Sequence, residues 1–379
     1  MDLDFDAKAL AFRDEVRTFL AENIPAEPLP SMDTTEGFEA HRAWERTLAD
    51  AHFSVVSWPA EYGGRDASIL EWVIFEEEYY AANAPGRVSQ NGIFLLAPTL
   101  FEHGTPEQRA RIMPRMARAD DIWAQAWSEP EAGSDLAAIR SPARQVDGGW
   151  WLSGSKIWSS RASFADWGFG LFRSDPQAQR HTGLTYFMFP LDAEGVTVRP
   201  IPQLDGEPGF AEIFLDEVFV PDADVIGAVN EGWRVAMSTS SNERGLSLRS
   251  PGRFTAAAQR LLALWRDRAD PSDTALRDKV VDAWIGANAY RLHTFGTVTR
   301  LTEGGSLGAE SSINKIFWSE LDVVLHETAL ELLGADAELS GAWMDGYLFS
   351  LSGPIYAGTN EVQRNVVSER LLGLPRAAR

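Results

Sequence analysis

One stretch of sequence carries most of the information about this chain: Trp123-Ala-Gln-Ala-Trp-Ser-Glu-Pro-Glu-Ala-Gly-Ser-Asp-Leu136. It opens with the pattern of a β-strand and then turns through small and acidic residues. Such a turn leaves backbone N–H groups and the hydroxyls of Ser128 and Ser134 free to bind a flat polar ligand. The same residues are also typical of a capped loop before a strand, which is the commoner meaning of a Ser-Asp turn.

Around this stretch, from about residue 121 to 227, apolar residues follow the period of two that β-strands show. Turns containing Gly, Asp and Pro separate the candidate strands, which we expect over 150–158, 167–173, 184–190 and 211–220. About 100 residues of this kind predict a central β-barrel or sandwich.

Helical spacing of apolar residues flanks this region on both sides. Thr105-Pro106 predicts a helix start, because Thr is a good N-cap and Pro is favoured at the first helical position. A later helix from Ser311 is expected to end at Gly334. The predicted fold class is α+β and multi-domain, with an N-terminal helical domain (1–120), a central β-domain (121–227) and a C-terminal four-helix bundle (228–379).

Composition narrows the function. The 379 residues include 34 basic and 55 acidic ones, and the net charge of −21 argues against nucleic acid or an anionic membrane as partner. The absence of Cys excludes disulfides, thiolate nucleophiles, iron–sulfur clusters and Cys-type zinc sites. The six His lack metal-binding spacing, so no metal site is expected. An acidic start and the lack of an apolar run of about 20 residues predict a cytoplasmic protein without a signal peptide or membrane insertion.

Two further segments suit ligand binding. Lys156-Ile-Trp-Ser-Ser160 places an aromatic ring beside two hydroxyls, although a lone Trp158 is more typical of a core. Ile355-Tyr-Ala-Gly-Thr-Asn-Glu-Val-Gln-Arg-Asn365 contains a Gly-Thr-Asn turn that enters a helix, and the exposed N–H groups of such a turn suit an anion. The plain alternative is an N-cap with Glu361 in the first turn.

Together the three segments resemble the acyl-CoA dehydrogenase family, and the resemblance extends to the closing Leu371-Leu-Gly-Leu-Pro-Arg376. The resemblance implies an FAD cofactor, an acyl-CoA substrate and an electron-transfer flavoprotein as acceptor. It implies that Ser134 meets the acyl-CoA. The positions implied to contact FAD are Gln125, Trp127, Ser128, Trp158, Ser159, Ser160, Thr359 and Glu361.

The chain departs from the commonest family pattern at the catalytic base. The usual base is a Glu directly before the Gly-Thr of the last segment, but this chain has Ala357, which cannot accept a proton. One branch of the family carries its base early in the C-terminal domain, directly before an Arg, and Asn242-Glu243-Arg244-Gly245 matches that pattern. The resemblance therefore implies that Glu243 is the base and that Arg244 stands near the substrate. The N–H group of Ala357 could still polarise the thioester carbonyl.

A second departure concerns the subunit contact. Family members usually carry an Arg, a Phe-Gly pair and a downstream Gln that reach the cofactor of a neighbouring subunit. The equivalent stretch, Leu264-Trp-Arg-Asp-Arg-Ala-Asp-Pro-Ser-Asp273, has no Phe-Gly, and Arg266 and Arg268 are the candidate replacements for the Arg. Similar degeneracy occurs in a bacterial branch of heterotetramers that act on bulky, steroid-derived acyl-CoAs. We therefore expect a dimer or tetramer, either of one chain or with an unlike paralogous subunit.

The expected function is α,β-dehydrogenation of an acyl-CoA thioester, in lipid or steroid catabolism. Two alternatives stay open. One is an acyl-CoA oxidase-like enzyme on the same scaffold that reduces oxygen directly. The other is a non-catalytic partner subunit, which Ala357 and the missing Phe-Gly favour.

Overall fold

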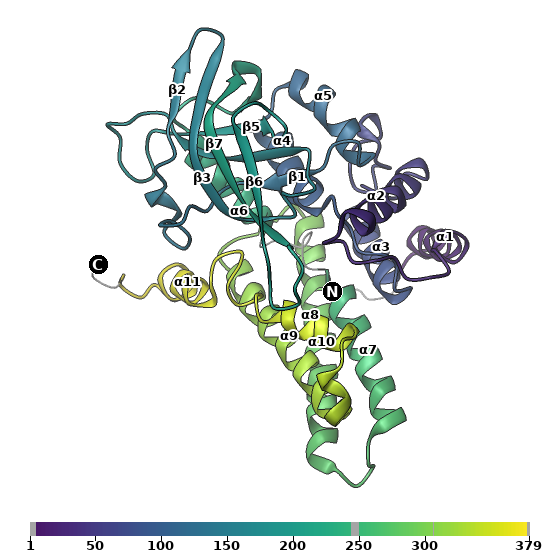
Figure 1. The fold of residues 1–379 in the computed structure, drawn as a ribbon. Coiled ribbons are helices and arrows are strands. Elements are labelled where there is room, and N and C mark those ends of the chain that lie inside the picture. Colours follow the sequence, from purple (N-terminus) through teal and green to yellow (C-terminus); the bar gives the residue numbers. More distant parts are fainter. Residues whose placement is uncertain (1–4, 244–249, 306, 377–379) are drawn as a thin grey trace. The chain divides into compact units, whose positions relative to one another are not determined.

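The computed structural model describes residues 5–243, 250–305 and 307–376, with the backbone alone for 241–243. The described residues form two compact units that do not follow chain order (Figure 1). One, called the sheet unit below, contains residues 25–66 and 85–243. The other, the helix unit, contains the described parts of 1–24, 67–84 and 244–379.

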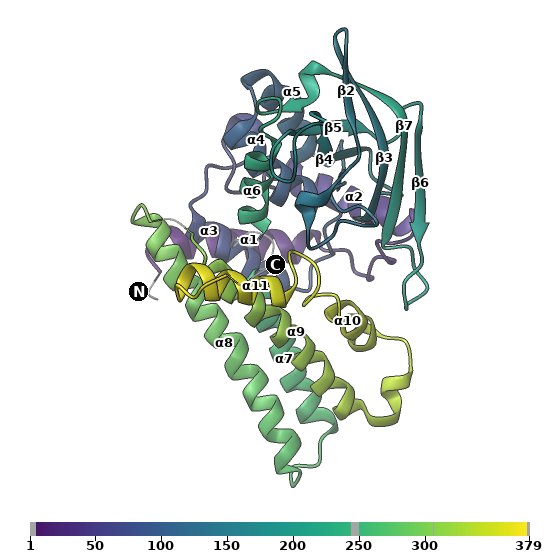
Figure 2. The same ribbon diagram turned by 90° about the vertical axis from the view of Figure 1, so that its left-hand side faces the viewer.

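The sheet unit contains two four-stranded sheets. The strand order is β1-β4-β5-β8 in the first sheet and β2-β3-β7-β6 in the second, and the strands of the second lie side by side in Figure 2. The β1–β4 pair is parallel and the other strand pairs are antiparallel. The strands are β1 (Trp123–Gln125), β2 (Ala143–Val146), β3 (Gly149–Ser160), β4 (Trp167–Arg173), β5 (Leu184–Pro190), β6 (Val196–Ile201), β7 (Phe210–Pro221) and β8 (Val225–Ile226).

One hydrophobic core joins the two sheets. Trp150 and Leu152 of β3 lie in the same buried cluster as Phe187 and Phe189 of β5. The predicted β-rich centre is therefore confirmed, in the form of a sandwich. The strands β4 and β5 have the predicted bounds, and β3 and β7 extend one or two residues further at each end. The sequence patterns did not predict the short strands β2, β6 and β8.

Four helices of seven or more residues belong to the sheet unit: α2 (Thr35–Asp50), α4 (Ala97–His103), α5 (Pro106–Ala117) and α6 (Gly232–Glu243). Helix α5 begins as predicted, because the Thr105 hydroxyl accepts the N–H of Gln108 at 3.2 Å and the Gln108 side chain accepts the N–H of Thr105 at 3.0 Å. Shorter helical segments are η1 (Ala60–Tyr62), η2 (Asn91–Leu96), η3 (Leu136–Ala138) and η4 (Asp222–Asp224).

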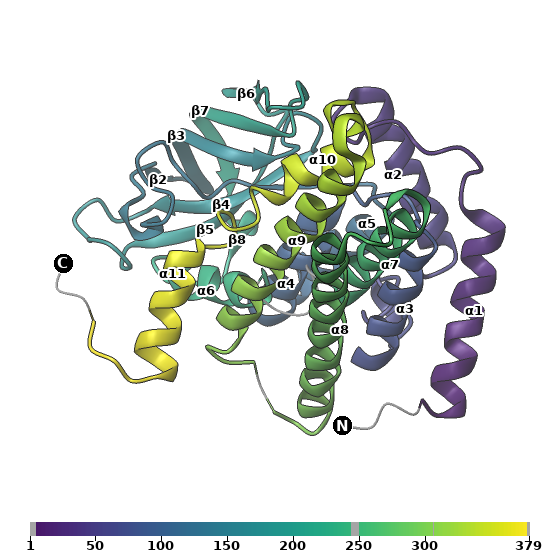
Figure 3. The same ribbon diagram turned by 90° about the horizontal axis from the view of Figure 1, so that it is seen from below.

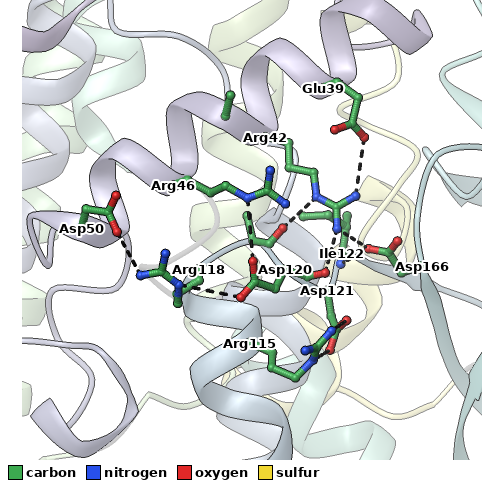
Figure 4. Close-up of polar contacts among 12 residues, drawn as sticks. Glu39, Arg42, Arg46, Asp50, Arg115, Arg118, Asp120, Asp121, Ile122 and Asp166 are labelled. Carbon is green, nitrogen blue, oxygen red and sulfur yellow. Dashed lines mark hydrogen bonds and ion pairs between the residues drawn. The ribbon is translucent and has the colours of Figure 1, made fainter.

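An ionic network holds the chain where it enters β1 (Figure 4). Arg42 of α2 donates to the carbonyls of Ala119 and Asp120, at 2.8 and 2.7 Å, and to the Asp166 carboxylate at 3.0 Å. The same carboxylate accepts the N–H of Ile122 at 2.7 Å. These contacts fix the direction of the stretch that starts at Trp123.

The helix unit is built from segments that are far apart in the sequence. Helices α7 (Pro251–Arg268), α8 (Thr274–Thr302) and α9 (Ser311–Leu333) pack against one another, as Figure 2 shows. Helix α3 (Ile69–Ala81) packs on both α1 (Ala7–Asn23) and α7 (Figure 3). The remaining segments are η5 (Gly334–Glu338), α10 (Ala342–Ser350), α11 (Asn360–Val366) and η6 (Val367–Leu371).

The end of α9 follows the prediction, because the next residue, Gly334, has a positive φ of 57°. Within the described ranges, none of the helices combines the length and apolar composition that a membrane crossing requires.

Candidate functional site

Strand β1 ends on a polar side chain that has an unmet hydrogen-bond donor among the described residues. Gln125, the last residue of β1, is half-buried, and among the described residues its Nε2 atom is buried without a hydrogen-bond partner. Buried polar groups in proteins nearly always find partners. An unmet donor at a predicted ligand contact therefore fits a binding site for a polar group.

Trp127 is packed into the sheet unit. Its indole N–H donates to the Tyr186 hydroxyl at 3.2 Å, and that hydroxyl lies 3.3 Å from the hydroxyl of Thr239 on α6. Thr239 in turn lies 2.7 Å from the hydroxyl of Thr99. The side chain of Trp127 is thus held in the core, and the same buried chain of hydroxyls fixes α6.

A one-residue bulge in β3 turns Trp158 outward. Lys156 pairs with Ile213, and Ser159 pairs with Ala211. Between these two pairs β3 therefore contains one residue more than β7. Trp158 has a φ of 62° and its side chain is 57% exposed. Ser159 takes the inward position, where its Oγ atom is buried and has no hydrogen-bond partner among the described residues. The interpretation of Trp158 as a core residue is therefore wrong. An exposed indole held in a conformation that side chains avoid is typical of a functional position.

A buried ion pair anchors the turn that follows Trp127. The Lys156 side chain is fully buried, and its Nζ atom lies 2.8 Å from Glu129 Oε1, 2.8 Å from the carbonyl oxygen of Leu171 and 3.5 Å from that of Trp127. The Glu129 carboxylate also accepts the N–H groups of Arg140 and Ser141, at 2.7 and 3.0 Å. Three oxygen acceptors around one nitrogen match a protonated ammonium group.

The electrostatics of this pair follow from burial. Burial lowers the pKa of Lys156 against the opposing effect of the Glu129 charge. Burial alone would raise the pKa of Glu129, but the Lys156 charge and the hydrogen bonds lower it below its usual range. The carboxylate is therefore ionised at neutral pH.

The sequence predicted no role for either residue of this pair. Lys156 shares the parity of Trp150 and Leu152 along β3, which is the parity of the buried face. A lysine at a buried strand position needs a carboxylate partner, so this parity was the signal that could have found the pair.

The turn between Glu129 and Arg140 leaves its tip at the surface. Ser128 is half-buried, and Ser134, which is expected to meet the substrate, is exposed. Asp135 next to it is paired with Arg180 at 2.6 Å. An open groove of about 650 Å³ in the same unit is lined by His181, Thr182, Asn230, Glu231, Trp233 and Arg234. Ser160 is half-buried at the end of β3.

The C-terminal segment forms a tight turn in the helix unit. Ala357 and Gly358 both have a positive φ, of 56° and 77°. The side-chain amide of Gln363 donates to the carbonyls of both residues, at 2.9 and 3.2 Å. Thr359 is the N-cap of α11, since its hydroxyl accepts the N–H of Val362 at 3.2 Å. Glu361 is exposed in the first turn of the helix.

A second fully buried lysine anchors this turn. Lys315 of α9 donates to the side-chain oxygen of Asn360 at 2.8 Å, and Ser319 donates to the same oxygen at 3.1 Å. Asn360 also donates its backbone N–H to the carbonyl of Pro354 at 2.8 Å. Asn360 therefore ties the segment that holds Ala357 and Thr359 to α9.

The structure describes the predicted base only in part. Glu243 is the last residue of α6, where its backbone is helical, and Arg244 lies outside the described residues. Because residues four apart share a helix face, the position of Glu243 lies on the same face of α6 as Thr239. The candidate arginines at the end of α7 are Arg266, which is exposed, and Arg268, which pairs with Asp336.

Comparison with known proteins decides the family. Models of the acyl-CoA dehydrogenase N-terminal, middle and C-terminal domains match residues 6–120, 124–218 and 230–372. The acyl-CoA dehydrogenase IpdE1 of Mycobacterium tuberculosis is 39% identical to this chain, over 97% of this chain and 98% of the relative. The chain belongs to the acyl-CoA dehydrogenase family. This family consists of flavin-dependent oxidoreductases, and the predicted family and fold class are confirmed.

Other acyl-CoA dehydrogenases are similarly close. IpdE1 of Mycolicibacterium smegmatis is 38% identical, over 96% of this chain and 97% of the relative. Among solved structures, the Tcur3481-Tcur3483 steroid ACAD has a TM-score of 0.86 at 26% identity, and 100% of each chain is covered. The ChsE4-ChsE5 complex of Mycobacterium tuberculosis has a TM-score of 0.84 at 27% identity, again with 100% of each chain covered.

Proposed function

We propose that this chain is an FAD-dependent acyl-CoA dehydrogenase that converts a saturated acyl-CoA to its 2-enoyl thioester. The observation that carries the proposal lies in the sheet unit. A bulge exposes the Trp158 indole, and the buried Gln125 amide and Ser159 hydroxyl have no partner among the described residues. An exposed ring and unmet polar groups suit the face and the edge of a flat heterocycle such as a flavin.

The residues proposed to hold FAD lie in two parts of the sequence, residues 125–160 and 359–361. Bound FAD supplies the electron sink that takes the β-hydrogen as hydride. In the sheet unit, the fixed backbone after β1 and the outward indole would orient the ring. In the helix unit, the turn before α11 would meet the polar part of the cofactor. The proposed contacts are Gln125, Trp127, Ser128, Trp158, Ser159, Ser160, Thr359 and Glu361.

Glu243 is the proposed base. It would take the α-proton while the β-hydrogen leaves as hydride, so that a C=C bond forms and the two electrons would be accepted by bound FAD. The backbone N–H of Ala357 would stabilise the developing negative charge on the thioester oxygen. Arg244 would stand near the substrate, and Ser134 would meet the acyl-CoA. Ala357 itself offers no carboxylate, which leaves the base role to another residue.

Substrate class and partners follow from the relatives. One of the two similar structures is a steroid ACAD, so we infer a bulky, ring-containing acyl-CoA as substrate. Both structures carry the names of two unlike chains, so we infer an unlike paralogous subunit as partner. A homotetramer or dimer is the alternative assembly. We propose an electron-transfer flavoprotein as acceptor, a cytoplasmic location and domain boundaries near residues 120 and 227.

Ala357 also favours a second candidate function, that of a non-catalytic subunit of a heteromeric enzyme. The two functions differ in what the protein does when expressed alone. A catalytic subunit should carry FAD and lose its flavin colour under anaerobic conditions with an acyl-CoA. The flavin of a non-catalytic subunit should not bleach with any acyl-CoA when the subunit is alone. It should also not bleach when the subunit is combined with a partner subunit whose catalytic base has been removed.

The test is anaerobic flavin bleaching across short, branched, aromatic and steroid-side-chain acyl-CoAs, with FAD bound per chain measured on the same sample. We expect bleaching with the bulky substrates. Peroxide formation in air that matches substrate use would instead identify an acyl-CoA oxidase. Failure to bind FAD, alone and with a coexpressed paralogous subunit, would contradict the proposal.

A further inference from the structure

We propose that the buried ion pair between Lys156 and Glu129 is a positioning device for the FAD site. It holds Trp127-Ser128 in a fixed register against Ile157-Trp158, so that its loss weakens FAD binding beyond any loss of stability. This inference rests on the proposed FAD-dependent function.

The first step is that Lys156 connects both sheets. It lies on β3 of the second sheet, and its ammonium group donates to the carbonyl of Leu171 on β4 of the first sheet at 2.8 Å. The contacts with Trp127 and Glu129 add the stretch that leaves β1. One side chain therefore ties together three segments that are separate in the sequence.

The second step concerns the turn on the other side. Glu129 and Ala132 exchange two backbone hydrogen bonds, of 3.1 and 2.9 Å, and the Glu129 carboxylate accepts the N–H groups of Arg140 and Ser141. The turn that carries Ser134 is thus closed at both ends by the same residue. Movement of the Glu129 carboxylate would move both ends.

The third step is the register between the two predicted flavin contacts. The N–H of Ile157 donates to the carbonyl of Ser128 at 2.9 Å, directly beside the Lys156–Trp127 contact. The bulge that exposes Trp158 begins at the next residue. The outward position of the indole is therefore defined relative to Trp127 and Ser128 by contacts at Lys156 and Ile157.

A buried charge makes this register selective. A fully buried ammonium group that loses its acceptors pays a large desolvation penalty, so alternative registers of the turn are disfavoured. An apolar residue at position 156 would pack in the same volume without selecting among registers. The positive charge of Lys156 is therefore needed to position the turn, and not to bury apolar surface area.

The experiment uses the full chain and FAD as the probe. The variants are Lys156→Met, Glu129→Gln and the double variant Lys156→Met/Glu129→Gln. The control is Arg144→Met, which removes an exposed ion pair with Glu217 on the same sheet. For each protein we would measure the Kd of FAD from titration of the FAD-free protein, the visible spectrum of bound flavin and the thermal unfolding midpoint.

We expect Lys156→Met to weaken FAD binding by about tenfold or more, which is the loss expected when hydrogen bonds to a charged group are removed. The double variant should regain thermal stability, because a neutral pair leaves no unpaired buried charge. Its FAD affinity and flavin spectrum should stay altered, since the contacts with Trp127 and Leu171 are still missing. The control should bind FAD as the unaltered chain does.

Recovery of FAD affinity together with stability in the double variant would show that the pair is structural only, and would overturn the inference. If Lys156→Met does not fold, the FAD affinity, flavin spectrum and unfolding midpoint of Glu129→Gln take its place in the comparison. Glutamine keeps the shape of the glutamate side chain and one acceptor oxygen. An unaltered chain that binds no FAD would count against the proposed function instead, so the two failures are distinguishable.

Discussion

The two segments predicted to bind FAD are anchored in parallel ways. In the sheet unit, the fully buried Lys156 holds the turn after β1, and Trp158 nearby has a positive φ. In the helix unit, the fully buried Lys315 holds the turn before α11, and Ala357 in that turn has a positive φ. The chain has four lysines, and the other two, Lys8 and Lys279, are exposed. Half of its lysines are therefore used to fix candidate site segments.

The difference lies in the partners and in the strained residues. Lys156 faces a carboxylate, whereas Lys315 donates to the neutral amide oxygen of Asn360. Trp158 presents an exposed ring, whereas Ala357 presents a methyl group. A buried lysine therefore holds one turn through a carboxylate and the other turn through an amide oxygen. The positive φ of Trp158 directs a side chain outward, whereas the positive φ of Ala357 lies at a residue whose backbone N–H is the proposed contact.

The largest expected effect separates the two lysines. Lys156→Met leaves the Glu129 carboxylate buried without its cation and should lower the free energy of unfolding by about 3 kcal/mol or more. Lys315→Met removes hydrogen bonds between a charged donor and an amide and should lower it by roughly 1.5–3 kcal/mol. Urea unfolding of both variants measures the difference. Equal losses would show that the charge of the partner does not matter, and a larger loss in Lys315→Met would reverse the comparison.

The second effect is a pH dependence that should be larger at the Lys156 anchor. Because the pKa of Glu129 is lowered in the folded protein, the ion pair adds stability above the ordinary pKa of about 4.5, and that stability is lost as the pH falls through the lower folded value. The gap between the unaltered chain and Lys156→Met should therefore shrink as the pH falls from about 4.5 through the lower folded pKa of Glu129, by about 1.4 kcal/mol for each unit between the unfolded and folded pKa values.

The matched measurement is the same pH series on Lys315→Met. Asn360 does not titrate and the nearby Glu361 carboxylate is exposed to solvent, so the gap for this variant should change less over the range than the gap for Lys156→Met. Urea unfolding at several pH values checks both variants. A gap for Lys156→Met that is constant with pH would mean that Glu129 is not held ionised by Lys156.

The smallest effect concerns the strained residues. A positive φ costs a residue with a side chain roughly 1 kcal/mol, and glycine avoids this cost. Neither Trp158→Gly nor Ala357→Gly should therefore lower the free energy of unfolding of the FAD-free protein. Only Trp158→Gly should weaken FAD binding, because only it removes a proposed ring contact. Asn83→Gly is the control, since Asn83 has a φ of 52° and asparagine tolerates that conformation. Unchanged FAD affinity in Trp158→Gly would remove the indole from the proposed site.

The sequence predicted local features well. Alternation bounded by turns gave the limits of β4 and β5, and Thr105-Pro106 gave the start of α5, because these signals depend on neighbouring residues only. It did not predict the short strand β2, which has four residues, or that α1 and α3 pack with the C-terminal helices. Those features depend on partners far away in the chain.

The candidate site divides in the same way. The segments that carry Trp158 and Thr359 were recognised as motifs, but the bulge that turns the indole outward depends on the pairing of β3 with β7. The anchors were missed because Glu129 and Lys156 are 27 residues apart and meet only in the folded sheets. The family pattern named the ligand contacts and said nothing of what fixes them.

We propose that Glu243 on α6 acts as the base, since position 357 is an alanine and offers no carboxylate. The direct test is the rate of anaerobic flavin reduction by an acyl-CoA in Glu243→Gln, compared with the unaltered chain. We expect the variant to keep its FAD and its unfolding midpoint but to reduce flavin at least about 10³-fold more slowly, as expected when a general base is removed. A rate within a few fold of the unaltered chain would contradict it.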